Sequence, residues 1–390
     1  MKRFSFALAL AALVSCGAAS AQISSDALQR LFVQAMQELQ GGNLAQAELH
    51  LREMLRHTDS PRVKLELARV LYLKGEYAEA KTLFQEISHR SDTPWRVVDN
   101  IGHFVRNIEE KTGYLKFGVT IVSDSNPRNL APQKEFAIGG FQVTPTETPK
   151  KLYGMRYTAR GWLPFGGSGY SGYATASYAD FPGQEIDRLT ADGGLVKNLT
   201  DSGRLRAKAG MEIGTLGGSE LYQFPYVGMD SVLAESATLR TTGEIRLGKV
   251  RFPDADYLNA TQTNAALSIR KVLADTAALS ISGSVEHGDT RERAYTYYGW
   301  EAGPGIDTFW PSSAFVVGAR AAVGARKYAD VDPLFGERRS DARARFDVSI
   351  GNKLWRWRSS YISLLGSLER NTSNIGFFSY RKANASVVFE

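Results

Sequence analysis

Charged side chains recur at every second position along several apolar segments of the C-terminal two-thirds of the chain. Arg204, Arg206 and Lys208, for example, alternate with Leu205 and Ala207. Because an extended chain turns successive side chains to opposite faces, each segment has one charged and one apolar face. The charged face comprises Arg156, Arg160, Arg204, Arg206, Lys208, Arg240, Arg246, Arg320, Arg343, Arg345 and Asp347, with Glu212 and Glu244 as further acidic members.

Two uses of this charged face are compatible with the pattern. The first is a network of ion pairs that stiffens the surrounding structure. The second is a basic conduit that selects or chaperones an acidic client, or passes small anions. If the segments cross a membrane, the charges must face a lumen, since a charge facing lipid near the midplane costs about 2 to 4 kcal/mol.

The sequence contains few residues in the patterns that are typical of catalytic or metal-binding sites. The single cysteine is Cys16, no phosphate loop, dinucleotide fingerprint or G-x-S-x-G motif occurs, and the histidines lack metal-ligand spacing. A Ser–His pair near His287 is the remaining catalytic alternative. The five histidines are His50, His57, His89, His103 and His287. We expect no enzyme activity, no metal and no cofactor.

The positive and negative charges that give the net charge of +6 are interspersed along the chain, which disfavours nucleic acid as a partner.

The charged faces belong to long predicted strands. From Gly113 to the last residue the apolar period is two, in fourteen segments of about 10 to 16 residues. Short connections alternate with longer ones such as 124–150, and aromatic residues gather near the short ones, as in a membrane-interface girdle. We therefore predict a 14-stranded antiparallel transmembrane β-barrel at 113–390. The girdle candidates are Trp162, Phe165, Trp310, Trp355, Trp357 and Tyr361.

A helical pattern precedes the strands. The segment 42–47 recurs at 75–80, a period of 33 residues that is typical of paired tetratricopeptide helices. Ala47 and Ala80 are the small residues that let the paired helices approach. The helix predicted for 95–110 would cap the stack. We predict a short α-helical, TPR-like domain at 22–112; an unrelated bundle of four or five helices is the alternative.

The first 21 residues have the features of an export signal. Lys2 and Arg3 precede an apolar stretch, and the small residues 19–21 form a cleavage site. Residues 13–16 also resemble a lipobox, which would make Cys16 an acylated first residue. Either interpretation takes the protein out of the cytoplasm.

Two segments carry a family resemblance. Residues 124–129 (DSNPRN) follow the first predicted strand, and 370–375 (RNTSNI) with 378–384 (FSYRKAN) form the predicted final hairpin. Together with the domain order, an α+β multidomain chain with helices before a barrel, they resemble the surface lipoprotein assembly modifier family. The resemblance implies an outer-membrane translocon that carries lipoproteins or small secreted proteins to the cell surface.

The expected partners are the client, outer-membrane lipid, and a periplasmic carrier or the barrel-assembly machinery. The helical domain would lie in the periplasm and recruit the client. A passive, anion-preferring porin is the alternative function, and a structural or adhesin-like barrel is a third. The pattern leaves open whether 124–150 plugs the lumen.

Overall fold

The computed structural model describes residues 25–138, 141–357 and 360–389, so the predicted signal segment and Cys16 lie outside the described residues. The chain forms two compact units that divide between Ala80 and Lys81. We call them the helical unit and the barrel unit. Secondary structure changes from helix to strand at Gly113, within the barrel unit. No described helix has the length and apolar character needed to cross a membrane.

Helices precede the barrel at the predicted spacing. Gly42 and Gly75 end helices with positive φ values of 82° and 84°, a conformation that glycine adopts without steric cost. Ala47 and Ala80 are fully buried, as close helix packing requires. The helices are α1 (Ser25–Gln40), α2 (Leu44–Leu55), α3 (Pro61–Lys74), α4 (Tyr77–His89) and α5 (Trp95–Thr112).

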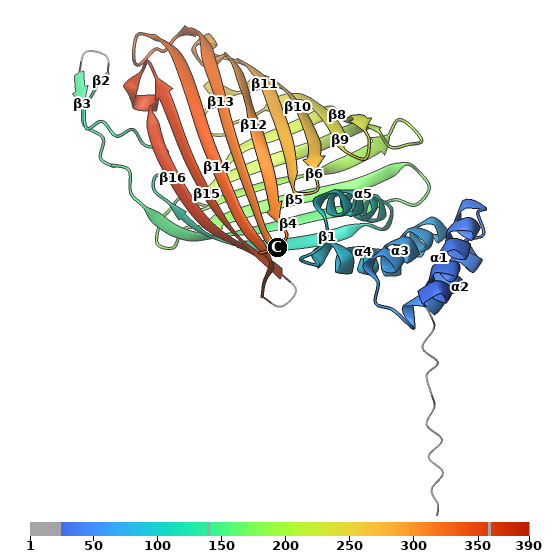
Figure 1. Cartoon of the computed structure of the whole chain (residues 1–390). Helices are drawn as coiled ribbons and strands as arrows, with labels where there is room; N and C mark the ends of the chain where they lie inside the picture. The colour runs from blue at the N-terminus through green and yellow to red at the C-terminus, as the bar shows by residue number, and fades with distance from the viewer. Residues whose placement is uncertain (1–24, 139–140, 358–359, 390) are drawn as a thin grey trace, which may run out of the picture. The chain divides into compact units, whose positions relative to one another are not determined.

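Fourteen antiparallel strands close into a barrel, in which β1 pairs with both β4 and β16 (Figure 1). Closure leaves no strand edge running the length of the wall, which is the condition for a sheet to cross a bilayer. The predicted strand number is confirmed. The barrel strands are β1 (Tyr114–Asp124), β4 (Leu152–Pro164), β5 (Tyr170–Asp180), β6 (Arg188–Asn198), β7 (Leu205–Leu216), β8 (Ser219–Glu235), β9 (Leu239–Val250), β10 (Ala260–Ala274), β11 (Ala277–Thr290), β12 (Tyr297–Trp310), β13 (Phe315–Val331), β14 (Arg338–Trp357), β15 (Ser360–Ser373) and β16 (Tyr380–Phe389).

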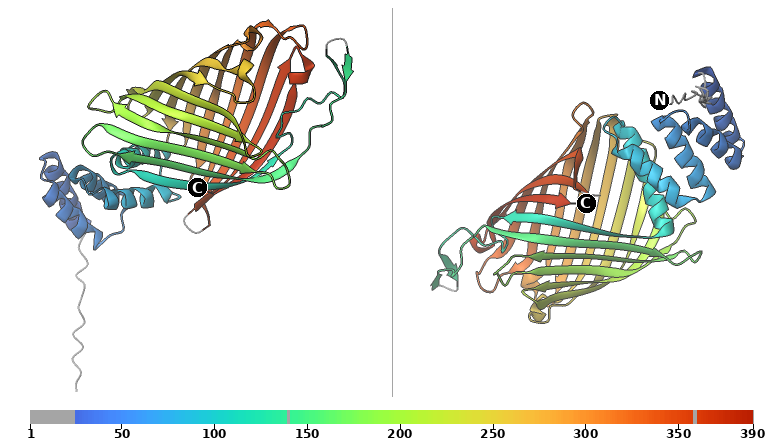
Figure 2. Two further views of the ribbon diagram at one scale, coloured as in Figure 1. Left: turned by 180° about the vertical axis from the view of Figure 1, so that it is seen from behind. Right: turned by 90° about the horizontal axis from the view of Figure 1, so that it is seen from below.

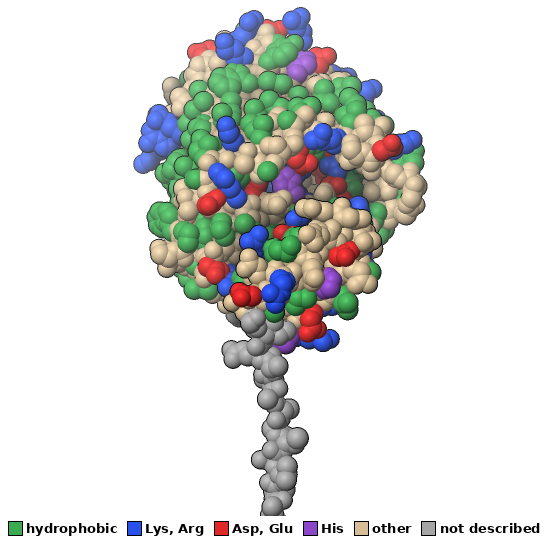
Figure 3. Space-filling view, turned by 45° about the vertical axis from the view of Figure 1, so that its right-hand side comes forward, with side chains coloured by type: hydrophobic (Ala, Val, Ile, Leu, Met, Phe, Trp, Pro, Cys, Tyr) green, Lys and Arg blue, Asp and Glu red, His purple; other side chains and the backbone are tan. Residues whose placement is uncertain are grey.

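The outer wall of the barrel is apolar. Phe117 is 71% exposed, Ile281 61% and Leu368 59%, values that would be unfavourable for side chains of this size against water. Figure 3 shows hydrophobic side chains over much of this surface. Such a wall is the lipid-facing surface of a membrane barrel.

The two ends of the barrel differ. At the end where β1 begins, the connections are 165–169, 199–204, 236–238, 275–276, 311–314 and 358–359. At the opposite end they are 125–151, 181–187, 217–218, 251–259, 291–296, 332–337 and 374–379. We call these the short-turn end and the long-loop end. The link 217–218 is the exception at the long-loop end, because two glycines at positive φ make a tight hairpin.

The longest loop does not fill the lumen. Within it, β2 (Phe136–Ile138) pairs with β3 (Phe141–Val143), and the Phe136 ring lies 5.3 Å from that of Phe377 in the last long loop. Figures 1 and 2 show this hairpin outside the wall at the long-loop end. The described part of segment 124–150 is therefore not a plug.

The aromatic residues predicted to form the girdle lie in different surroundings. Phe165 and Trp310 are exposed, and Trp355 packs edge-on against Phe315 with ring centroids 5.4 Å apart. Trp162 is an exception, because its indole NH donates to the Glu110 carbonyl of α5 at 3.1 Å. The Tyr361 ring contacts His89 instead, at 4.6 Å. The Trp357 side chain is outside the described set.

Candidate functional site: a charged lumen with a helix at its mouth

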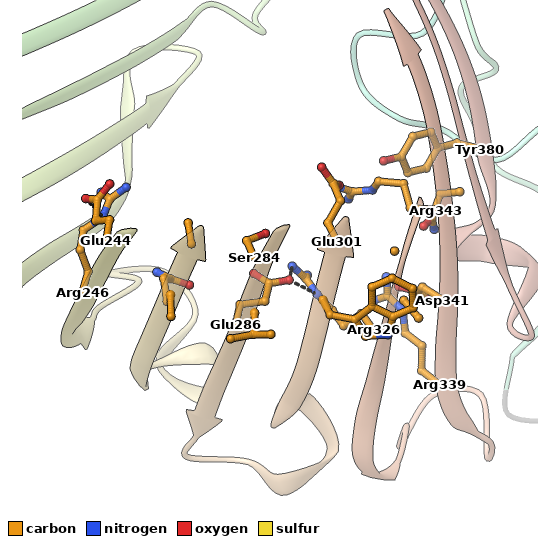
Figure 4. A pocket seen from close by; sticks show the side chains of 18 residues that line it. Glu244, Arg246, Ser284, Glu286, Glu301, Arg326, Arg339, Asp341, Arg343 and Tyr380 are labelled. Atoms are coloured by element: carbon orange, nitrogen blue, oxygen red, sulfur yellow. Dashed lines mark hydrogen bonds and ion pairs between the residues drawn. The ribbon is translucent and has the colours of Figure 1, made fainter. Parts of the chain in front are cut away.

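Polar and charged side chains from eight successive strands line one cavity of about 380 Å³ inside the barrel (Figure 4). They lie at the positions that alternate with the apolar outer residues. Their charges are therefore held in the lumen, away from lipid. The members labelled in Figure 4 are Glu244, Arg246, Ser284, Glu286, Glu301, Arg326, Arg339, Asp341, Arg343 and Tyr380.

Most arginines in this cavity have acidic partners. Arg326 forms an ion pair with Glu286 across β12, and the Arg339 guanidinium lies 2.7 Å from the Asp341 carboxylate. Each Arg also lies over an aromatic ring; Arg326, for example, is 4.2 Å from the Tyr297 centroid. The Arg326–Glu286 pair joins two strands and so helps to hold them in register, which is the stiffening function considered from the sequence, whereas the Arg339–Asp341 pair lies within β14.

A second charged group lies on β7, β8 and β9. Asp230 accepts from Arg206 at 2.7 Å and lies 3.2 Å from the Lys208 ammonium. Arg246 lies 3.1 Å from Glu244. This group borders a further lumen cavity of about 430 Å³.

The structure pairs most, but not all, of the charged residues singled out from the sequence. Among the described residues, Arg156, Arg160 and Arg204 have no ion-pair partner, and all three are exposed. Arg156 and Arg160 lie on β4, at positions that alternate with outward-facing Met155 and Tyr157. The paired members are Arg206, Lys208, Arg240 with Glu235 (3.0 Å), Arg246, Arg320 with Asp307 (3.3 Å), Arg343 with Glu369 (3.6 Å), and Arg345 with Asp347 (2.8 Å).

Helix α5 lies at the short-turn mouth and contacts strands from both sides of it (Figure 2). The sequence predicted this helix but placed it on the helical stack, whereas it belongs to the barrel unit. One face carries Asp99, His103, Arg106 and Glu110, spaced by four, three and four residues. The sequence signal for the position of α5 was this charged stripe, because charges on one face of a helix can pair with the opposite charges inside the barrel.

The first turn of α5 is attached at the β10–β11 connection. The Trp95 backbone NH donates to the Asp275 carbonyl at 2.6 Å, and the Trp95 and Phe309 rings are 6.4 Å apart. Just before the helix, the Lys353 ammonium donates to the Arg90 carbonyl at 3.0 Å. Backbone, aromatic and charged contacts therefore position this end.

The middle of α5 contacts lumen charges. Asp99 accepts a hydrogen bond from Arg270 of β10, and His103 Nδ1 lies 2.9 Å from the Glu235 carboxylate. Burial, and then the positive charge of Arg106, lowers the pKa of His103, although Glu235 and Asp99 oppose this effect. At neutral pH the ring is therefore uncharged, and protonation disfavours the docked helix.

The last turn of α5 is held by β1, β4 and β7. Glu109 is buried between the ammonium groups of Lys116 (2.9 Å) and Lys81 (3.0 Å). Burial raises the pKa of Glu109, but hydrogen bonds from the two lysines outweigh it, so the pKa lies below its usual range. Glu110 accepts from Arg206 at 3.0 Å. The helix end and the barrel wall are therefore linked by ion pairs, in which Glu109 is buried while Lys116 and Glu110 remain about half exposed.

Metal chemistry has no visible basis in the described part of the chain. No group of three or more His, Cys, Asp or Glu side chains there could hold a metal ion. His287 stacks on Tyr298 with ring centroids 4.1 Å apart, on the outer side of the wall. Its Nδ1 lies 2.9 Å from the Tyr297 carbonyl oxygen. The ring therefore has structural contacts.

A closed barrel of fourteen strands with an apolar outer wall and an unequal pair of ends is an outer-membrane β-barrel. Residues 227–390 match the surface lipoprotein assembly modifier family, and residues 38–94 match a tetratricopeptide repeat. The resemblance seen in the sequence is thereby confirmed, as are the TPR-like helices and the outer-membrane location. The family match over this part of the barrel supports a role in surface lipoprotein assembly.

Solved structures with a similar arrangement are distant. A bacterial polysaccharide outer membrane secretin is 10% identical, with a TM-score of 0.37, covering 70% of this chain and 98% of that one. The outer membrane protein OprD from Pseudomonas aeruginosa is 9% identical, with a TM-score of 0.37, covering 71% and 92%. An outer membrane channel from Pseudomonas putida is 12% identical, with a TM-score of 0.35, covering 71% and 95%. No functionally curated protein matches the chain.

Proposed function

We propose that this protein is an outer-membrane translocon that delivers lipoproteins or small secreted proteins to the cell surface. The observation that carries the proposal is α5, which is attached at the short-turn mouth by contacts along its whole length. A pore for passive diffusion gains nothing from a helix held at its entrance. A translocon requires a barrier that opens only when a client is present.

The proposed orientation in the membrane rests on the two ends of the barrel. The barrel chain enters at Tyr114 and leaves at Phe389, both at the short-turn end. In outer-membrane barrels short turns face the periplasm and long loops face the exterior. We therefore assign α5 to the periplasmic entrance, and the preceding helical unit to the periplasm.

The helical unit is proposed to recruit the client or its periplasmic carrier. Tetratricopeptide repeats stack into surfaces that bind extended peptides. The charges in the lumen would then accompany the client through the barrel. This is a transport role, and we propose no enzymatic step.

The test is a comparison of surface-exposed proteins in cells with and without this chain. Intact cells are labelled with a membrane-impermeant biotin reagent, and the labelled proteins are identified by mass spectrometry. One or more lipoproteins or small secreted proteins should lose labelling in the deletion strain while their total amount stays constant. Unchanged labelling of all surface proteins would refute the proposal.

A passive anion-preferring channel is a second candidate, because Arg156, Arg160 and Arg204 have no ion-pair partner among the described residues. Such a channel should give large, steady, anion-selective currents in planar bilayers without any client. Replacing Arg156 and Arg160 with Glu should then reverse the ion preference. Mostly closed wild-type channels would exclude this candidate.

A further inference from the structure

Two arginines face outward from the barrel wall near the long-loop end. Arg370 in β15 and Arg381 in β16 lie directly opposite each other in the antiparallel ladder, and both side chains are exposed. Arg370 continues the outward row that includes Leu364 and Leu368, and Arg381 shares its face with Ala383. Both guanidinium groups therefore lie on the lipid-facing side, just beyond the apolar part of the wall.

No acid among the described residues pairs with either arginine. The nearest acid in sequence, Glu369, faces the lumen, where it accepts from Tyr380 at 2.6 Å. Like charges directly opposite each other on neighbouring strands repel. An anion from outside the protein, bound between them, would remove this repulsion.

An apolar depression adjoins the two arginines on the outer wall. Its volume is about 660 Å³, within the range of about 300 to 1,000 Å³ that is typical of ligand sites. Alanines alternate with larger side chains there, and their small size leaves the space. The outward-facing residues that line it are Ala321, Val323, Ala344, Phe346, Leu368 and Ala383.

We propose that this surface binds a phosphate-bearing lipid, with its phosphate between Arg370 and Arg381 and an acyl chain in the depression. Arginine suits this role because its planar group donates two parallel hydrogen bonds to phosphate. Lys249 and Lys327 are also exposed, outward-facing cations. Each lies at the long-loop end of a row of outward-facing apolar residues in its strand. The charge at this level of the wall matches an anionic headgroup layer. The apolar depression favours a lipid over a free anion.

The test uses the full chain in phosphatidylcholine nanodiscs and two probes, lipid A with both phosphates and the same lipid after dephosphorylation. Native mass spectrometry measures the lipid that remains bound during a titration. The double variant Arg370→Gln/Arg381→Gln should bind phosphorylated lipid A at least tenfold more weakly. The matched control is Lys249→Gln/Lys327→Gln, which removes the same charge elsewhere on the rim and should bind as the wild type does.

A third variant, Ala344→Phe, fills the depression and keeps both arginines, so it tests the acyl half of the site without a charge change. It too should weaken binding severalfold, and heat-modifiable gel mobility checks that each barrel is folded. Equal weakening in the control pair would show general charge attraction and overturn the proposal. Equal binding of dephosphorylated lipid, displacement by millimolar inorganic phosphate, or no effect of Ala344→Phe would also overturn it.

Discussion

The ion pair between Asp99 of α5 and Arg270 of β10 should help to hold the channel closed. Asp99→Asn removes the negative charge and keeps the side-chain volume. The two side chains are 20% and 30% exposed, so the pair is partly shielded from water. A hydrogen-bonded pair of this exposure contributes about 1 to 2 kcal/mol, between the values for surface pairs and for buried charged hydrogen bonds.

A loss of about 1 to 2 kcal/mol should increase the ratio of undocked to docked helix about 5- to 30-fold. The assay is single-channel recording in planar bilayers, in which the open probability should increase by that factor. The exchange variant Asp99→Arg/Arg270→Asp should return the open probability towards the wild-type value. Asp92→Asn is the matched control, because Asp92 is exposed and pairs locally with Arg90 at 2.9 Å. Unchanged open probability in Asp99→Asn, or no recovery on exchange, would refute the gating role of α5.

Three further predictions follow from the same structure. Acidification from pH 7.5 to 5.5 should increase the open probability. The pKa of His103 in the docked helix lies below the ordinary value near 6.5, so the preference for docking is fully present above pH 6.5 and is lost as the pH falls through the docked-state pKa. His103→Gln should remove the part of the pH dependence that this ring causes. Phe346→Arg, on the lipid face, should impair barrel assembly by about 2 to 4 kcal/mol, whereas Arg343→Ser, in the lumen, should leave heat-modifiable mobility intact; equal tolerance at both positions would mean that the faces are assigned wrongly. Ala47→Arg, at a fully buried helix contact, should destabilise the helical unit by about 1 to 3 kcal/mol or more, which limited proteolysis should detect as faster cleavage of that unit. Client delivery should decrease while the barrel still assembles. Normal delivery with an unfolded repeat would place client recognition in the barrel.

Strand parity illustrates what local sequence determines. An alternation of two alone assigns Leu205 and Ala207 to the apolar face, and Arg206 and Lys208 to the charged face. The structure places the two charged residues beside Asp230, at a lumen cavity. The alternation is a property of any extended chain, so no long-range information was needed.

Strand register determined which charges meet. Arg326 pairs with Glu286 from a strand forty residues earlier, and Arg370 faces Arg381 because β15 and β16 align at that position. Periodicity gives the face of each residue but not its height relative to the next strand. The sequence therefore does not predict that Arg370 and Arg381 are adjacent; the pairing of β15 with β16 determines it.

The amino-acid sequence by itself determined the order of helices and strands, the number of barrel strands and the apolar outer face, because each follows from side-chain spacing within one segment. Only the tertiary structure placed α5 at the mouth of the barrel, since its charged stripe is compatible with water or with any oppositely charged surface. Its partners Arg270, Glu235 and Lys116 come from three separate strands. Barrel closure brings those strands together around one opening. Such contacts between residues far apart in the sequence cannot be predicted from side-chain spacing within one segment.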